Sequence, residues 1–145
     1  MKSIFSKIIQ GKVPASFVYQ DEKVSAFMDI QPINPGHVLV IPNEQVASLS
    51  ELDEETGAHL FRIGQRIAKA LRQSSLQCEG VNLFIADGQA ANQDVAHVHL
   101  HVLPRFRGDG LKGLLENQIE SRLPTRTELD QTAEVIKSTL DNISG

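Results

Sequence analysis

The feature that most constrains the fold of this chain is a run in which histidines and apolar residues alternate. His97, His99 and His101 are each followed by an apolar residue. A period of two predicts a β-strand, because successive side chains of a strand point to opposite faces. We therefore expect a strand over residues 97–103, ended by Pro104. Its three imidazoles should share one face, and the intervening apolar side chains should point into the core.

Three roles are open for these imidazoles. A metal ion could be held by two adjacent histidines, either His97 with His99 or His99 with His101. His37 could supply a further ligand, and the loop of Asp87 and Asp94 could supply oxygen. All three cannot share one ion, since His97 and His101 are roughly 13 Å apart in an extended strand. A second interpretation is an exposed strand whose histidines only tolerate solvent.

The third role is nucleophilic catalysis at phosphorus. A neutral imidazole is a good nucleophile when one ring nitrogen is free and the other donates its proton to a fixed acceptor. Neighbouring imidazoles can bind phosphate oxygens and pass a proton to the leaving group. This role uses all three histidines and needs no metal.

The rest of the chain predicts helices placed between strands of an antiparallel sheet, which is an α+β fold. A long helix should begin at Asp53, and a C-terminal helix should begin near Thr127 and Asp130. The other expected elements are a short helix over 4–11, a hairpin of strands 17–20 and 24–28, a turn-rich connection over 29–36, strands 37–41 and 81–86, a polar loop over 87–94, and a looser stretch over 105–124.

Length and composition favour one domain over residues 1–145 and exclude two classes of partner. The chain has 14 Lys and Arg against 18 Asp and Glu, so we expect no broad nucleic-acid surface. No segment approaches the roughly 20 apolar residues of a membrane span. The single Cys78 allows no internal disulfide and suits a reducing cytoplasm, where we expect the protein to reside.

The sequence resembles the histidine triad (HIT) superfamily of nucleotide-binding hydrolases and transferases. The run from His97 to Leu103 matches its signature, in which three histidines alternate with apolar residues. Similar segments extend from Ser3 to Arg107, and Gln93 and Pro104 flank the triad as in many members. The resemblance implies a HIT-like fold with its core over about 3–107, followed by a C-terminal tail and helix over 108–145.

By this resemblance, His99 is the nucleophile that attacks the α-phosphate of a nucleotidyl substrate. His101 contacts the phosphate and assists the leaving group, and His97 supports the triad. His37 matches a further histidine near the site. Gln93 and Asp94 lie in the loop that meets the phosphate.

The resemblance also implies the residues that bind the nucleoside. Asp29 falls where members bind the ribose hydroxyls, and a carboxylate accepts hydrogen bonds from both hydroxyls of a cis-diol. A turn residue that bonds its own backbone is the alternative for Asp29. Phe27 and Ile30 fall where members enclose the base, with core packing as the alternative.

Several residues depart from the family pattern. Many bacterial members hold a structural zinc with two cysteines and a histidine where this chain has Ser3, Ser6 and Gln45. Hydroxyls and an amide are poor zinc ligands, so we expect no structural zinc. Asp94 replaces a hydroxyl residue that meets the phosphate, and Ala86 replaces an amide residue.

These observations predict a compact, metal-independent HIT hydrolase that needs no cofactor. It should act on nucleoside phosphoramidates or other nucleotidyl conjugates through a nucleotidyl-histidine intermediate. The alternatives are a dinucleoside polyphosphate hydrolase and a nucleotide-binding scaffold with weak catalysis. The resemblance also implies a homodimer.

Overall fold

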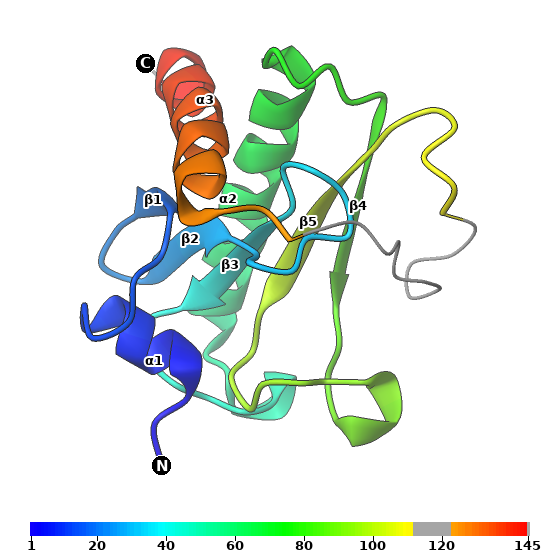
Figure 1. The fold of residues 1–145 in the computed structure, drawn as a ribbon. Helices are drawn as coiled ribbons and strands as arrows, with labels where there is room; N and C mark the ends of the chain where they lie inside the picture. Colours follow the sequence, from blue (N-terminus) through cyan, green and yellow to red (C-terminus); the bar gives the residue numbers. More distant parts are fainter. Residues whose placement is uncertain (112–122, 145) are drawn as a thin grey trace.

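A computed structural model describes residues 1–111 and 123–144 (Figure 1), so most of the predicted looser stretch lies outside the described residues. The chain forms helices and strands in an α+β arrangement, as expected. In chain order the elements are α1 (Ile4–Ile9), β1 (Phe17–Gln20), β2 (Val24–Met28), β3 (Val38–Pro42), the 3₁₀ turn η1 (Leu49–Glu51), α2 (Glu54–Gln73), β4 (Gly80–Ile85), the 3₁₀ turn η2 (Gln89–Ala91), β5 (Leu100–Arg105) and α3 (Arg126–Ser144).

The five strands form one antiparallel sheet in the order β1-β2-β3-β5-β4. The last histidine of the triad lies on β5, which is an inner strand. His101 pairs with Leu39 of β3 on one side and with Phe84 of β4 on the other. Residues paired across neighbouring strands share a face of the sheet, so these three side chains lie together.

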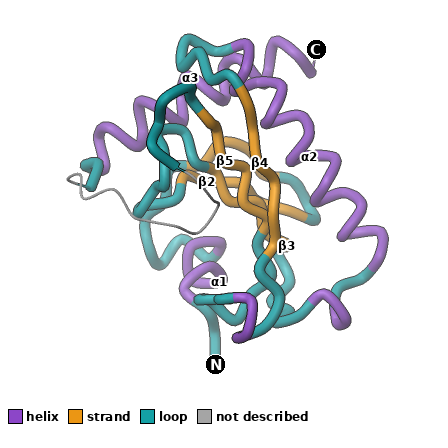
Figure 2. Tube along the Cα trace, turned by 90° about the vertical axis from the view of Figure 1, so that its right-hand side faces the viewer, coloured by secondary structure: helices purple, strands orange, loops and turns teal. Residues whose placement is uncertain are grey.

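The two faces of the sheet are covered by different helices. Figure 2 shows α2 along one side of the strands and α1 on the opposite side. The larger apolar core joins the α2 face of the sheet to α2 and α3. The smaller core is formed by Phe5 and Ile8 of α1 with Phe27, Leu39 and Ile41. Because His101 shares a face with Leu39, it lies on the α1 side.

The long helix α2 begins and packs as its sequence predicts. The Asp53 carboxylate caps it by accepting from the backbone N–H of Thr56. One face is buried through Leu60, Ile63, Gly64, Ile67, Ala70 and Leu71. Gly64 brings the helix close to the sheet, because a Cβ there would lie 2.6 Å from Cδ2 of Leu100. Within the described residues, no helix is long and apolar enough to cross a membrane.

The C-terminal helix α3 begins slightly earlier than the sequence predicts. Thr125 and Glu128 form the reciprocal cap, in which each side chain accepts from the backbone N–H of the other. Asp130 is not part of this cap. It accepts a hydrogen bond from the Ser16 hydroxyl at 2.6 Å, which ties α3 to the residue just before β1.

The predicted bounds of the histidine strand are wrong at both ends. β5 begins at Leu100, so His97 and His99 precede the ladder. The strand also continues through Pro104, which pairs with Val81. The Pro104 carbonyl accepts from the Asn34 side chain and therefore points away from β4. The backbone nitrogen of the same residue points to the same side. The ladder therefore needs no N–H from this proline.

Candidate active site

His99 has one ring nitrogen fixed by the backbone. Its Nδ1 lies 2.7 Å from the carbonyl oxygen of His97, and a carbonyl can only accept, so Nδ1 carries the proton. In the neutral ring the lone pair is then on Nε2. The side chain is only 2% exposed, but Nε2 lies 3.3 Å from Oδ1 of the exposed Asp94. The free nitrogen therefore faces the accessible side of the site.

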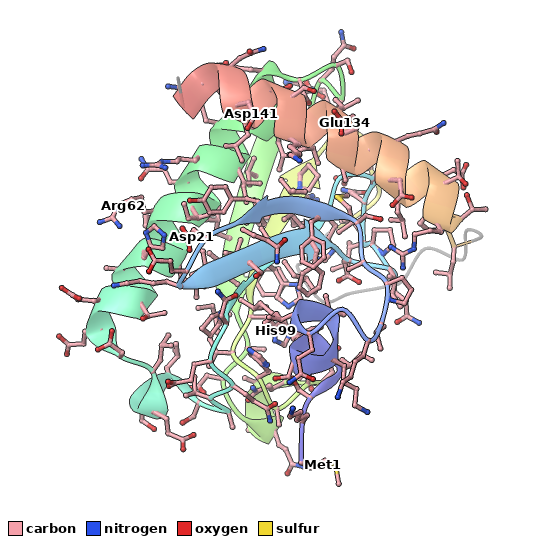
Figure 3. All side chains as sticks on the ribbon, turned by 90° about the vertical axis from the view of Figure 1, so that its left-hand side faces the viewer. Met1, Asp21, Arg62, His99, Glu134 and Asp141 are labelled. Carbon is pink, nitrogen blue, oxygen red and sulfur yellow. The ribbon has the colours of Figure 1, made fainter. Side chains whose placement is uncertain are left out.

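The short helix α1 packs against His97 and His99. The Phe5 ring meets the His99 ring edge-on with centroids 5.1 Å apart, and it meets the His97 ring similarly at 5.8 Å. Figure 3 shows His99 beside α1, whereas Asp21 and Arg62 lie near α2. The fifth histidine, His59, is bound to Asp21 at 2.6 Å and does not belong to this group.

His97 is buried, and both of its ring nitrogens are occupied. Its Nε2–H donates to the carbonyl of Pro42 at 2.8 Å, so its Nδ1 accepts from the Ser3 hydroxyl at 2.7 Å. Burial lowers the pKa of His97 below its usual value. The interpretation of an exposed strand is wrong, because His97 and His99 are both buried.

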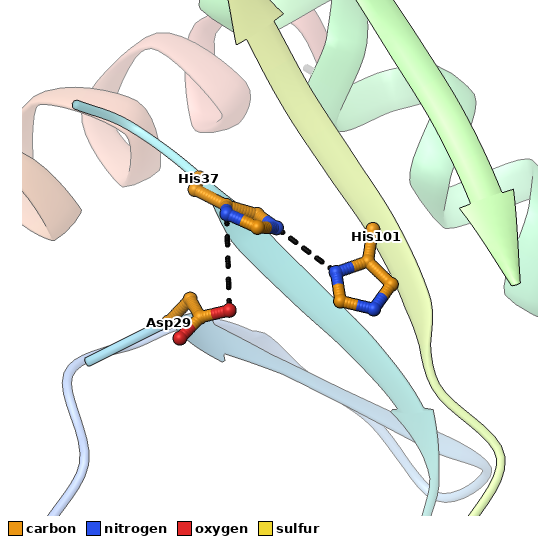
Figure 4. A group of neighbouring side chains, drawn as sticks. All are labelled: Asp29, His37 and His101. Atoms are coloured by element: carbon orange, nitrogen blue, oxygen red, sulfur yellow. Dashed lines mark hydrogen bonds and ion pairs between the residues drawn. The ribbon is translucent and has the colours of Figure 1, made fainter. Parts of the chain in front are cut away.

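His37 and His101 form a hydrogen-bonded pair (Figure 4). The backbone N–H of Ile33 donates to Nδ1 of His37 at 3.1 Å, so neutral His37 carries its proton on Nε2. That proton is donated to Nδ1 of His101 at 3.0 Å. Neutral His101 therefore carries its own proton on Nε2, where it can donate to a ligand.

This pair is held in the neutral state. Burial lowers the pKa of both His37 and His101 to about 4, and the proximity of His99 adds to this for both rings. The proximity of His37 lowers the pKa of His101 further. The ring of Phe84 stacks on His101 with centroids 4.3 Å apart and planes 6° apart. His101 is thus a fixed neutral donor, and its centroid lies 4.9 Å from that of His99.

Asp29 approaches the pair from the end of β2. Its Oδ1 accepts from the backbone N–H of Gln31, and its Oδ2 lies 3.7 Å from Nδ1 of His37. The turn interpretation therefore holds for one oxygen and leaves the other available to a ligand. Burial raises the pKa of Asp29.

The structure brings together a different metal-ligand set from the one that the sequence suggests. Asp29, His37 and His101 each offer a ligand atom, and these atoms lie within 4.8 Å of one another. His37 is in this set, as expected, but neither His97 nor His99 belongs to it. The backbone N–H of Ile33 already occupies Nδ1 of His37, which leaves Nε2 as its ligand atom.

The three residues at the expected zinc positions are bonded to one another. Oε1 of Gln45 accepts from the backbone N–H of Ser3 and from the Ser6 hydroxyl, both at 2.7 Å. The Ser3 hydroxyl accepts from the backbone N–H of Ser6 and donates to His97. These groups are neutral and already hydrogen-bonded, so this donor set does not fit a structural zinc.

The Gln93 side chain organises the loop before the triad. Its oxygen accepts from the backbone N–H of Gly88, and its nitrogen donates to the carbonyls of Ala47 and Val95. Both amide hydrogens are therefore committed to the backbone. Only the amide oxygen retains capacity for a nucleotide contact.

The two residues expected at the base have different surroundings. Phe27 is 2% exposed and packs edge-on against Phe5 and Phe17, as the core interpretation predicts. Ile30 is 57% exposed, which leaves its side chain accessible to a base.

Sequence reasoning missed Phe5, Phe84 and the backbone N–H of Ile33 as parts of this site. The apolar run over residues 81–86 predicts β4 as a strand, but only the register with β5 places Phe84 over His101. The Ile33 contact depends on the turn before β3, which residue types alone do not specify. The sequence indicates Ser3 only as a substituted zinc ligand.

Several known proteins are similar to this chain in sequence. A HIT domain model matches residues 10–108. A HIT-like protein of Borreliella burgdorferi is 42% identical over 108 residues, which is 74% of this chain and 78% of that protein. The purine nucleoside phosphoramidase of Escherichia coli is 36% identical over 102 residues, 70% of this chain and 86% of that protein.

The solved structures agree. A zinc-bound histidine triad family protein from Mycobacterium smegmatis superposes with a TM-score of 0.86 at 38% identity, covering 99% of this chain and 96% of that one. The match to the HIT domain spans more than half of the chain and includes the whole triad. The chain therefore belongs to the histidine triad (HIT) family of nucleotide-binding hydrolases and transferases.

Proposed function

We propose that this protein is a metal-independent hydrolase of nucleoside phosphoramidates and related nucleotidyl conjugates. The observation that carries the proposal is the tautomer of His99. Its Nδ1–H is bonded to the His97 carbonyl, which leaves the Nε2 lone pair free at the accessible side of the site. The name of the phosphoramidase from Escherichia coli supports this substrate class.

The first chemical step follows from this geometry. His99 Nε2 attacks the α-phosphorus of a phosphoramidate whose nitrogen has taken up a proton from water. The bond from phosphorus to nitrogen breaks, its electron pair stays on nitrogen, and the leaving group departs as a neutral amine. The His101 Nε2–H donates a hydrogen bond to the phosphate oxygens or the leaving group. The product is a nucleotidyl-imidazolium whose positive charge is stabilised by the His97 carbonyl.

In the second step, water attacks the same phosphorus and loses a proton to the solvent, and the bond from phosphorus to Nε2 of His99 breaks, which releases the nucleoside monophosphate. The imidazole departs with its Nδ1–H bond still in place, and His99 returns to its starting tautomer. Asp29 holds the ribose through its Oδ2, and Ile30 contacts the base. Neither step requires a metal ion.

Turnover of adenosine 5′-phosphoramidate in the presence of EDTA tests this proposal. Wild-type protein should release AMP, and EDTA should not change the rate. His99→Ala should lose turnover but still bind AMP. His59→Gln is a matched control, because His59 lies outside the site. Loss of activity with EDTA, or retained turnover in His99→Ala, would refute the mechanism.

A nucleotide-binding protein with weak turnover is the second candidate, because Asp94 brings a negative charge to the attacking nitrogen. Tight AMP binding without turnover of either phosphoramidates or dinucleoside polyphosphates would favour it.

We also propose a second copy of this chain as a partner. β4 is the last strand of the sheet, and it pairs with β5 on one side only within the described residues. All six of its residues are partly exposed, and Val81, Leu83, Phe84 and Ile85 among them are apolar. An edge of this kind favours pairing with another strand.

A further inference from the structure

Asp94 places a negative charge at the atom that attacks the substrate. Its Oδ1 lies 3.3 Å from Nε2 of His99, and its side chain is 79% exposed. Within the part of the chain that the structure describes, no lysine or arginine lies within 4 Å of this carboxylate. Its charge is therefore not neutralised by a fixed cation.

The contact is unfavourable for neutral His99. Nδ1 holds the only ring proton, so the Nε2 lone pair faces the lone pairs of the carboxylate oxygen. A phosphate that reaches Nε2 must come within a few ångströms of this carboxylate, and two like charges at such distances repel strongly.

The rest of the pocket offers little positive charge to offset this repulsion. His37 and His101 are neutral at pH 7, because burial lowers the pKa of each to about 4. Asp29 contributes a second carboxylate. Burial raises its pKa, and the nearby charge of Asp94 raises it further.

We propose that Asp94 sets substrate specificity by charge, favouring a single reacting phosphate with an uncharged leaving group over a polyphosphate chain. The substrates named rest on the proposed function. The repulsion of anions from the nitrogen of His99 does not, since it follows from the position of the carboxylate alone.

The test compares Asp94→Asn, which removes the charge and keeps the shape, with Asp87→Asn. Asp87 lies in the same loop and accepts from the backbone N–H of Leu49, a bond that an asparagine oxygen preserves. The measured quantity is kcat/KM for diadenosine tetraphosphate divided by kcat/KM for adenosine 5′-phosphoramidate. Asp94→Asn should raise this ratio about tenfold or more, and Asp87→Asn should leave it unchanged.

Salt supplies an independent check of the charge effect. In 1 M salt the Debye length is about 3 Å, so the difference between wild type and Asp94→Asn should shrink. The proposal would be overturned if the ratio of the two kcat/KM values rose equally in Asp94→Asn and Asp87→Asn. It would also be overturned if salt did not reduce the difference in this ratio between wild type and Asp94→Asn.

A binding measurement separates this proposal from the proposed function. Inorganic phosphate is titrated while the ring signals of His99 are followed by NMR. Asp94→Asn should bind phosphate about tenfold more tightly than wild type and Asp87→Asn. Tighter binding without turnover of any conjugate would support the role of Asp94 and refute the proposed function. Equal phosphate affinities would refute the role of Asp94.

Discussion

A single backbone amide determines the protonation pattern of two histidines in this site. The N–H of Ile33 fixes the tautomer of His37, and His37 in turn fixes that of His101. Because the low pKa of both rings keeps them neutral, His101 presents a donor to the ligand without needing to be charged. This arrangement suits an anionic phosphate in a site with two carboxylates.

The neutral pair predicts how stability depends on pH. The pKa of His37 and His101 is about 4 in the folded protein, against about 6.5 in the unfolded chain. Between these pH values the unfolded chain binds more protons than the folded protein does. The free energy of unfolding therefore falls as the pH is lowered from about 6.5 to about 4. Above pH 6.5 the two groups should cause no change.

Urea unfolding at a series of pH values measures this effect. His101→Gln removes one of the two groups, so its stability should fall less steeply than that of wild type between pH 6.5 and 4. If the free energy of unfolding falls equally steeply with pH in wild type and His101→Gln, then His101 is not held neutral by the fold.

Ser3 is predicted to position His97, and through the His97 carbonyl to position His99. The Ser3 hydroxyl also caps α1, so substitutions must separate the two roles. Ser3→Ala loses both, whereas Ser3→Asp retains a cap but cannot donate to His97. We expect Ser3→Asp to lower kcat severalfold with little change in KM, and Ser3→Thr to retain activity.

Thermal unfolding provides the control for these variants. Ser3→Ala should lose about 1 kcal/mol of stability through the lost cap, and Ser3→Thr, which keeps the hydroxyl, should lose less than Ser3→Ala. If Ser3→Asp has the kcat of wild type, the bond to His97 does not position the nucleophile.

At the scale of elements, two glycines of α2 should respond in opposite ways to alanine. A Cβ at Gly57 would make an ordinary contact at 3.6 Å, but one at Gly64 would lie 2.6 Å from Leu100. Gly57→Ala should stabilise the protein by about 0.5–1 kcal/mol through helix propensity. Gly64→Ala should destabilise it by about 1–3 kcal/mol through overpacking.

Chemical denaturation of both variants checks this pair. Leu100 lies between His99 and His101, so Gly64→Ala should also reduce activity, while Gly57→Ala should not. Stabilisation by Gly64→Ala would mean that α2 does not pack against β5 as closely as the structure shows.

Local sequence patterns predicted most helices and strands, because the periodicity of apolar residues and the helix caps depend on only a few neighbouring residues. The hairpin of β1 and β2 and the Asp53 cap of α2 occur where the sequence places them. The ends of β5 could not be predicted in this way. A proline normally ends an inner strand, and Pro104 is tolerated because β3 pairs with β5 only as far as Val102.

At the scale of the whole molecule, local sequence patterns predict which residues belong to the site but not how they contact one another. The triad signature and the resemblance to the HIT family identified His99, His101 and His37 as candidates. Their connections depend on sheet register, which sets the pairing of β5 with β3 and β4. The bond from Ser3 to His97 joins residues 94 positions apart, and no local pattern indicates such a contact.

The proposed dimer predicts concentration-dependent behaviour of β4. Light scattering after size exclusion should give twice the mass of the chain. Hydrogen exchange should show that the backbone amides of Gly80–Ile85 that are not bonded to β5 are protected at high concentration and exposed on dilution. A monomeric mass, or exchange at these amides that is independent of concentration, would contradict the proposed pairing.

The central claim is that His99 Nε2 attacks phosphorus and that water then displaces it. The stereochemical course at phosphorus tests this claim directly. An adenosine phosphoramidate with sulfur in place of one α-oxygen is hydrolysed in isotopically labelled water, and the configuration of the product is determined. Two successive in-line displacements predict overall retention. Inversion would show that water attacks the substrate directly and would contradict the nucleotidyl-His99 intermediate.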